Sequence, residues 1–448
     1  MHKPELLAPA GTLRNARYAL AYGADAVYAG LPRYSLRVRN NDFLPDKLAL
    51  GISEAHALGK RFYLACNVMP HGAKLKTFID DMAPVVGLGP DALIMSDPGL
   101  ILLVRERWPE LPIHLSVQAN TVNAAAVRFW QQQGLSRVIL SRELALEEVE
   151  EIRQACPEME LEVFVHGALC IAYSGRCLLS GYFNHRDANQ GTCTNSCRWD
   201  YRVSQPVAGP GVSTDLAGLP RHPQADQLYL LEEKERPGEL LPVFEDEHGT
   251  YIMNSKDLRA VEHVQRLVQI GVDCLKIEGR TKSHYYTART TQVYRRAIDD
   301  ALQGLTFDSR LLADLEGLAH RGYTDGFYQR HPSKELQNYR YGSSRSERQQ
   351  FVAEVTGFDS RLGLSALDVK NKLRIGDRLE LMTPEGNHDF ELELMLDRQG
   401  DPMREAPGGG YRVWAKLPVN GLPNGLLCRY LEAEKLSPPE HPMSDSQT

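Results

Sequence analysis

The alternation of short apolar runs with helical patterns constrains the fold of this chain most. Between residue 4 and about residue 303 it predicts eight strands, at Glu5–Ala10, Ala26–Ala29, Phe62–Val68, Ala92–Ser96, Ile113–Ala119, Arg137–Ser141, Glu162–His166 and Cys274–Glu278. Helices are expected between them, as at Thr12–Tyr22 and Asn123–Gln133, each followed by a glycine. Strands that are apolar throughout suit a parallel sheet covered by helices on both faces. The predicted fold is therefore a TIM-like (β/α)8 barrel over residues 1–303. An open doubly wound sheet is the alternative, but no G-x-G-x-x-G follows the first strand.

The pattern changes twice along the chain. Residues 170–250 are rich in cysteine and then in proline, which predicts an irregular insertion after strand seven. A helix at Ser255–Gly271 returns to the barrel, and residues 304–350 read as a helical or irregular linker. Residues 351–435 alternate with a strand-like period, which predicts a small antiparallel β-barrel, and residues 436–448 read as a disordered tail. Its expected strands are Phe351–Val355, Leu362–Ala366, Asp377–Met382, Asp389–Leu396, Tyr411–Lys416 and Leu426–Tyr430.

Composition limits the compartment and the partners. The chain has 448 residues, a hydrophobic content of 42%, and neither an apolar run of transmembrane length nor a signal-peptide pattern. We therefore expect a cytoplasmic protein with reduced thiols and no membrane partner. The net charge of −7 gives no overall basic field for nucleic acid, although a local basic patch remains compatible with it.

Four of the eight cysteines lie close together, at Cys170, Cys177, Cys193 and Cys197. Chance clustering is one interpretation, and a structural zinc site is another. Zinc ligands usually come as two C-x₂₋₄-C pairs, and only Cys193 and Cys197 have such a spacing. An iron–sulfur cluster tolerates irregular spacing, so a [4Fe–4S] cluster is favoured. Cys170 follows His166 by four residues, at the carboxyl end of strand seven, where barrel enzymes place their active sites.

The residues around these cysteines carry a longer motif. The runs Glu162-Val163-Phe164-Val165-His166-Gly167-Ala168-Leu169-Cys170 and Gly175-Arg176-Cys177 resemble the signature of the family labelled peptidase U32. The segments 4–11, 189–199, 254–258 and 276–280 extend the resemblance, which covers residues 1–435. It is greatest to a branch of that family that forms 5-hydroxyuridine in bacterial tRNA.

This resemblance implies a specific activity. It implies prephenate-dependent, O₂-independent 5-hydroxylation of the wobble uridine (U34), with a [4Fe–4S] cluster, prephenate as co-substrate and the tRNA anticodon region as partner. The cluster ligands carry over as Cys170, Cys177, Cys193 and Cys197. Some relatives take a fourth cysteine from elsewhere in the chain, so Cys66 and Cys274 stay open as substitutes for Cys197. An electron donor or partner protein is implied without being identified.

Polar residues after the predicted strands are candidates for binding and catalysis. His166, Glu278 and Arg280 are the candidate catalytic residues. The candidate substrate-binding residues are Gln118, Asn120, Arg142 and Lys276, with Asn67 and Asn254 as possible polar lining. A guanidinium binds a carboxylate through two parallel hydrogen bonds, which suits a dicarboxylate such as prephenate. The alternatives are a salt-bridged polar layer over the barrel and a histidine that only completes the core.

The helix expected after strand eight is a candidate RNA contact. It interleaves basic and aromatic side chains, which suits phosphate contact and base stacking. The residues are Arg280, Lys282, Arg289, Arg295 and Arg296 with Tyr285, Tyr286 and Tyr294. A solvated amphipathic helix is the alternative.

Two other functions compete with tRNA hydroxylation. A U32-type peptidase, such as a collagenase-like hydrolase, is disfavoured because neither H-E-x-x-H nor G-x-S-x-G occurs in the sequence. A cysteine that ligates a cluster is also not free to act as a nucleophile. An iron–sulfur accessory or scaffold protein for a hydroxylation pathway remains the non-enzymatic alternative.

Overall fold

A computed structural model of the chain describes residues 2–36, 42–168, 229–232, 240–246, 249–251, 256–320, 322–329, 348–419 and 423–431. Its centre is a closed ring of eight parallel strands, which confirms the predicted barrel. The strands are β1 (Glu5–Pro9), β2 (Ala26–Gly30), β3 (Arg61–Cys66), β4 (Ala92–Met95), β5 (Ile113–Leu115), β6 (Arg137–Ile139), β7 (Glu160–Ala168) and β12 (Cys274–Ile277). β12 closes the ring because it pairs in parallel with both β7 and β1.

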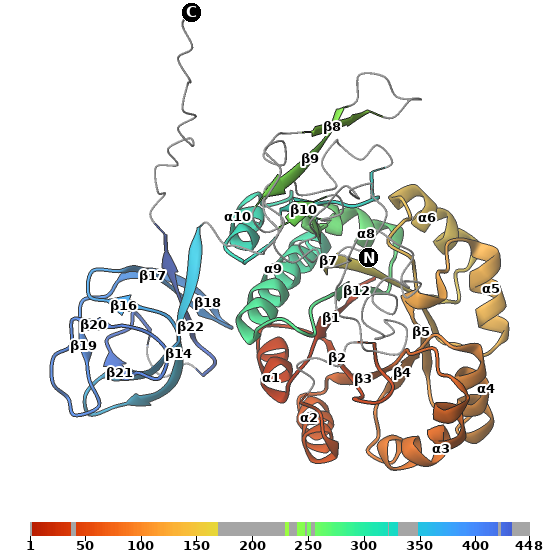
Figure 1. The fold of residues 1–448 in the computed structure, drawn as a ribbon, viewed down its shortest axis with the longest axis horizontal. Helices are drawn as coiled ribbons and strands as arrows, with labels where there is room; N and C mark the ends of the chain where they lie inside the picture. The colour runs from red at the N-terminus through yellow and green to blue at the C-terminus, as the bar shows by residue number, and fades with distance from the viewer. Residues whose placement is uncertain are drawn as a thin grey trace, which may run out of the picture. The chain divides into compact units, whose positions relative to one another are not determined.

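Helices surround the ring of strands (Figure 1). They are α1 (Leu13–Ala21), α2 (Pro45–Ala57), α3 (Gly72–Val86), α4 (Pro98–Arg107), α5 (Ala124–Gln132), α6 (Leu146–Ala155), α8 (Val264–Ile270) and α9 (His284–Leu302). Several begin at a side-chain cap: Thr12, Asn123 and Ser283 each accept a backbone N–H three residues ahead. α1 ends before Gly23, whose φ of 104° places it in the left-handed region that favours glycine.

Two predicted elements of the barrel differ from the structure. The strand expected at Ile113–Ala119 stops at Leu115, and Val117–Ala119 forms a short 3₁₀ helix, which Asn120 ends in the left-handed conformation (φ 52°). The helix expected at Ser255–Gly271 begins instead with β11 (Asp257–Arg259), which pairs antiparallel with the end of β7. The short β13 (Tyr323–Thr324) pairs with β11, so part of the region expected to be a linker extends the barrel's sheet.

A buried ion network fills the interior of the barrel. The Glu162 side chain is fully buried, and its two oxygens accept hydrogen bonds from Lys276 Nζ at 2.7 Å and from Arg137 Nη1 at 3.3 Å. Arg137 also contacts Glu5 at 2.7 Å and Glu160 at 2.8 Å. Burial by itself raises the pKa of Glu162, but the charges of Lys276 and Arg137 outweigh it and lower that pKa. The network therefore ties four strands together through charges that depend on one another.

The chain divides into two compact units. The first consists of residues 1–311 and 320–344, and the second of residues 312–319 and 345–448. The second has an antiparallel sheet in the order β18-β17-β22-β14-β15-β21-β19, which confirms the predicted β-rich domain. Its core includes Leu367, Leu379 and Leu427. The strands are β14 (Gln349–Asp359), β15 (Leu364–Val369), β17 (Arg378–Thr383), β18 (Gly386–Glu391), β19 (Met395–Leu396), β21 (Arg412–Ala415) and β22 (Leu426–Tyr430).

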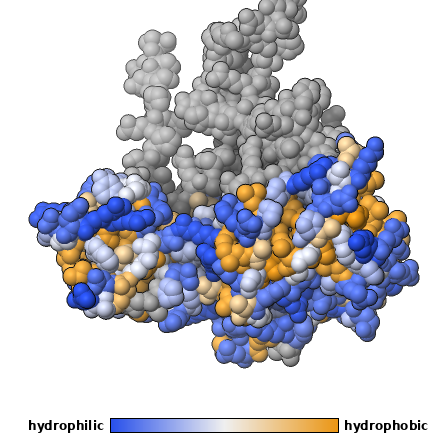
Figure 2. Space-filling view, turned by 90° about the horizontal axis from the view of Figure 1, so that it is seen from below, coloured by the Kyte–Doolittle hydropathy of each residue, from blue (hydrophilic) through white to orange (hydrophobic). Residues whose placement is uncertain are grey.

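None of the described helices is long and apolar enough to cross a membrane. On the face shown in Figure 2, hydrophilic and hydrophobic residues are interspersed. Exposed apolar side chains such as Leu44, Leu58 and Leu102 belong to different helices or loops. Exposed apolar residues that are scattered in this way are normal for a protein surface.

The ion network makes a stability prediction. Replacement of Arg137 by Met would leave the Glu162 and Glu5 carboxylates short of a counter-charge, and removal of one partner of a buried pair costs about 3–5 kcal/mol. We expect urea unfolding of Arg137→Met to show a loss of that size. Arg17→Met is the control, because Arg17 pairs with Glu54 at the surface, and we expect it to cost less than about 1 kcal/mol. Equal losses in the two variants would contradict this account of the barrel interior.

Candidate active site at the barrel mouth

The carboxyl ends of the eight strands form one rim, which we call the barrel mouth. Below it, the Lys276 ammonium lies 4.4 Å from the centre of the Tyr28 ring and 5.4 Å from that of Phe164. Cations are attracted to the faces of aromatic rings. Lys276 is buried and held by Glu162, so a residue predicted to bind substrate lies beneath the rim as part of the ion network.

Two arginines stand over the same two rings. The Arg142 guanidinium carbon lies 3.7 Å from the centre of the Phe164 ring, and that of Arg280 lies 5.6 Å from the centre of the Tyr28 ring. Lys276 below the rim and the two arginines at the rim therefore each place positive charge near an aromatic ring. This arrangement concentrates cations at the mouth, which favours an anionic ligand there.

Glu278 lies between these groups. Its Oε2 is 3.8 Å from Arg142 Nη2 and 3.4 Å from the Tyr28 hydroxyl, which also donates to the Ile277 carbonyl at 3.0 Å. Burial, followed by the charge of Glu278, raises the pKa of Tyr28 well above its ordinary value, so the hydroxyl stays protonated. Arg280 donates from Nη1 to Ser35 Oγ at 2.6 Å. The predicted residues Arg142, Glu278 and Arg280 are thus brought together, along with Tyr28 and Ser35.

Gln118 and Asn120 follow β5 on the rim. Gln118 accepts a hydrogen bond from Asn67 Nδ2 at 3.0 Å and one from the Ser116 hydroxyl. The Asn120 amide donates to the Gln118 carbonyl at 2.9 Å, which holds the turn after the 3₁₀ helix. Asn67 follows β3 and is buried, so it supports Gln118 from behind. Asn254 lies outside the described residues.

His166 lies apart from this polar group. Its ring is buried, with the rings of Tyr286, Tyr294 and Tyr323 at 5.8, 5.6 and 5.5 Å between centroids. Burial is the main cause that lowers the pKa of His166 to about 3, with Asp257 acting in the opposite direction. The ring is therefore neutral, and its described neighbours include residues of α9, β11 and β13. Its catalytic role stays a prediction.

The prediction that α9 contacts RNA through its basic and aromatic side chains is largely wrong. In α9, Tyr285, Tyr286, Arg289 and Tyr294 are all buried. Tyr294 donates to the Val165 carbonyl at 2.6 Å, so its ring packs toward the barrel. The alternation of basic and aromatic residues reflects a helix packed on two sides, since α9 contacts both α1 and α8. The Arg296 side chain is exposed but pairs with Asp308 at 2.7 Å.

The four clustered cysteines, Cys170, Cys177, Cys193 and Cys197, lie outside the described residues. Within the described part of the chain, no group of three or more His, Cys, Asp or Glu could hold a metal ion. The two alternative ligands differ in position. Cys66 ends β3 at the mouth, with burial raising its pKa to about 12, whereas Cys274 begins β12 at the opposite, amino end of the strands. Cys274 is therefore poorly placed for a cluster at the mouth.

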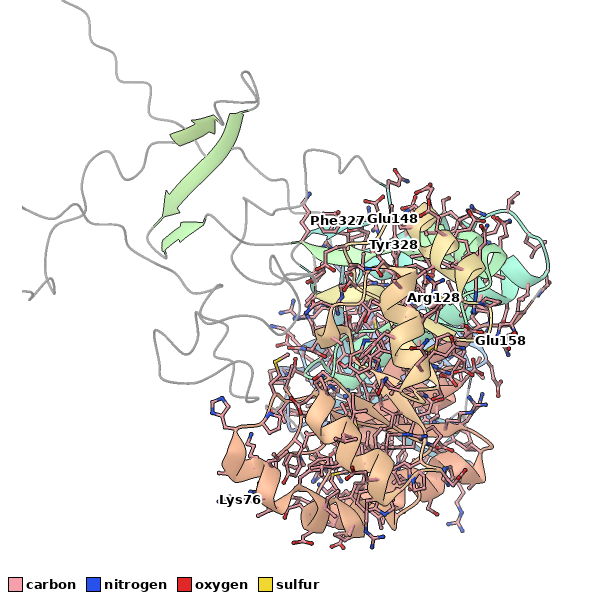
Figure 3. The ribbon with its side chains drawn as sticks, turned by 90° about the vertical axis from the view of Figure 1, so that its right-hand side faces the viewer. Lys76, Arg128, Glu148, Glu158, Phe327 and Tyr328 are labelled. Carbon is pink, nitrogen blue, oxygen red and sulfur yellow. The ribbon has the colours of Figure 1, made fainter. Side chains whose placement is uncertain are left out.

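A hollow lies among the outer helices. It has a volume of about 630 Å³ and is lined by α6, α8 and residues around Tyr328. Figure 3 shows Glu148 and Tyr328 near each other on this side. Tyr328 donates to the Phe164 carbonyl at 2.6 Å, so it anchors the segment to the back of β7. This hollow is separated from the mouth by the wall of the barrel.

Comparison with known proteins places both units in one family. The model for peptidase family U32 matches residues 11–338, and the model for the peptidase family U32 C-terminal domain matches residues 347–429. The chain is 62% identical to "tRNA hydroxylation protein P" of Escherichia coli over 97% of this chain and 98% of the relative. It is 57% identical to the protein of that name from Haemophilus influenzae, over 96% of each chain. A "Collagenase" of Porphyromonas gingivalis is 28% identical over 85% of this chain and 86% of that protein.

The buried His166 makes a prediction about pH. The folded-state pKa of about 3 lies below the unfolded value near 6.5, so the unfolded chain takes up a proton first as the pH falls. This contribution to stability is full above about pH 6.5 and is lost progressively toward pH 3. Between pH 7.5 and pH 5 the loss should be about 2 kcal/mol. Urea unfolding of the wild type and His166→Phe at both pH values checks it; an equal pH dependence in the two would contradict the buried neutral ring.

Proposed function

Because this chain belongs to peptidase family U32, we propose that its place in the family is that of a tRNA hydroxylation enzyme. The observation that carries this function is the 62% identity to tRNA hydroxylation protein P over nearly the whole of both chains. A relative named collagenase is far less similar, at 28% identity. The described thiol at the mouth, Cys66, is not an activated nucleophile, because burial raises its pKa.

We further propose that the reaction is the prephenate-dependent, O₂-independent 5-hydroxylation of the wobble uridine U34. The cationic mouth supports an anionic co-substrate, because Arg142 and Arg280 stand over aromatic rings with Glu278 as their nearby carboxylate. Prephenate carries two carboxylates, which suit two guanidinium groups. An anticodon uridine is single-stranded, so its base can enter a concave site.

A [4Fe–4S] cluster on Cys170, Cys177, Cys193 and Cys197 is part of this proposal. Four thiolates are a suitable donor set for such a cluster. Cys170 follows Ala168, the last residue of β7, by two positions, and the carboxyl end of β7 belongs to the mouth. Installing a hydroxyl at C5 removes two electrons from the base, so the reaction needs an electron acceptor, and a bound cluster would pass the electrons to it. The residues of the mouth would bind and orient the co-substrate.

Complementation tests the function. Expression of this chain in a bacterium that lacks tRNA hydroxylation should restore a nucleoside heavier than uridine by one oxygen atom, detected by mass spectrometry of digested tRNA. We expect Arg142→Leu to lower this yield through weaker co-substrate binding, since a hydrogen bond to a charged group contributes about 1.5–3 kcal/mol. Arg128→Leu, on the exposed side of α5 (Figure 3), is the matched control and should restore the nucleoside fully. An unmodified tRNA with the wild-type chain would contradict the function.

Metal analysis tests the cluster. Anaerobically purified protein should contain iron and sulfide in equal amounts, and Cys170→Ala should lose both. Cys156→Ala removes a buried thiol at the end of α6 and should keep the cluster. Stoichiometric zinc in a colourless protein would contradict the cluster. Loss of iron in Cys66→Ala together with retention in Cys197→Ala would transfer the fourth ligand to Cys66.

A further inference from the structure

A chain of hydrogen bonds runs along the rim from the loop after β2 to the turn after β5. The Leu36 backbone N–H donates to Asn67 Oδ1 at 3.2 Å. The Asn67 amide nitrogen donates to Gln118 Oε1 at 3.0 Å and lies 3.4 Å from Ser116 Oγ. The Ser116 hydroxyl donates to the same Gln118 oxygen. We call this chain the amide relay.

The direction of the amide relay is fixed by chemistry. A backbone N–H can only donate, so the Asn67 atom that it meets must be the carbonyl oxygen. The other atom of the Asn67 amide is then the NH₂ group, which also can only donate. Its partner on Gln118 must therefore be the oxygen. The Gln118 amide orientation thus follows from one backbone N–H two links away.

The end of the relay is a hydrogen-bond donor at the mouth. Gln118 Oε1 already accepts from Asn67 and Ser116, so the free side of the amide is its NH₂ group. Among the described residues, Gln118 Nε2 has no hydrogen-bond partner, and the side chain is only partly buried. Asn67 behind it is buried, as is Ser116. Gln118 therefore presents N–H groups at this point of the rim.

We propose that Asn67 is a positioning residue, which acts through Gln118 to bind an acceptor oxygen of the substrate. The proposal rests on the proposed function. It adds a residue that determines whether the ligand must offer a hydrogen-bond acceptor or a donor at this point. A carboxylate oxygen is favoured over a nucleobase carbonyl because Leu36 follows Ser35, the residue that holds the Arg280 guanidinium. A donor on the same rim as a cation suits a ligand that only accepts.

Two substitutions of Asn67 separate this role from a structural one. Asn67→Asp keeps the shape and the bond to Leu36 but turns the donor into an acceptor, so Gln118 should rotate and present its oxygen to the ligand. Asn67→Ala leaves Gln118 able to adopt either orientation. We expect Kd to rise about tenfold or more in Asn67→Asp and about threefold in Asn67→Ala. A structural role predicts the reverse order, because alanine removes all the side-chain hydrogen bonds.

The new charge of Asn67→Asp needs its own control. In a Gln118→Ala background no amide can rotate, whereas the charge of Asp remains. The relay predicts that Asn67→Asp costs about tenfold in the wild-type background but less than about twofold in Gln118→Ala. Equal costs in both backgrounds would assign the effect to charge and overturn the proposal. Ser96→Ala is the control for local packing, because Ser96 donates only to the Asn67 backbone carbonyl, at 3.1 Å.

The experiment measures the binding of two probes, prephenate and unmodified tRNA, to the full chain by calorimetry. The melting temperature of every variant is measured as well. Weaker binding of prephenate alone supports the relay with a carboxylate as ligand. Weaker binding of tRNA alone supports the relay with a nucleobase carbonyl. Unchanged binding of both probes in Asn67→Asp overturns the relay and leaves the proposed function intact. Binding of neither probe by the wild-type chain overturns both.

Discussion

The Glu162 carboxylate is the interaction on which the barrel depends. It is fully buried on β7 and shares its two oxygens between Arg137 of β6 and Lys276 of β12. β12 is the strand that closes the ring, so this carboxylate joins the last strand to its neighbours from inside. Burial of a charge without a partner is costly, and the three groups are therefore stable only as a set. The closed ring and the network support each other.

The network also determines the character of the mouth. Glu162 holds the Lys276 ammonium near the Tyr28 and Phe164 rings. Arg280 and Arg142 lie over the same two rings, at the rim. Positively charged side chains therefore lie near aromatic rings both inside the barrel and at its rim. On the same rim, the Gln118 side chain presents its NH₂ group as a hydrogen-bond donor. A ligand that offers carboxylate oxygens matches these cations and this donor.

Much of this architecture could be predicted from the sequence, because parallel strands buried on both faces have continuous apolar sequences. The residues Arg142, Glu278 and Arg280 were identified by their position after strands, and the structure brings them together. Tyr28 was not identified as a site residue, since it looks like an ordinary residue of its strand, and Asn67 was predicted only as polar lining. The burial of Arg289 in α9 was missed because interleaved basic and aromatic residues resemble a solvent-facing pattern. Only the packing of α9 between α1 and α8 distinguishes the two.

We propose that this chain itself carries out O₂-independent hydroxylation of tRNA at the barrel mouth. The direct measurement is an anaerobic reaction of the purified, cluster-loaded chain with unmodified tRNA and prephenate, followed by mass spectrometry of the wobble nucleoside. We expect 5-hydroxyuridine that depends on prephenate and increases with the amount of protein. No product from a protein that holds its cluster and binds both substrates would contradict the claim and favour an accessory role.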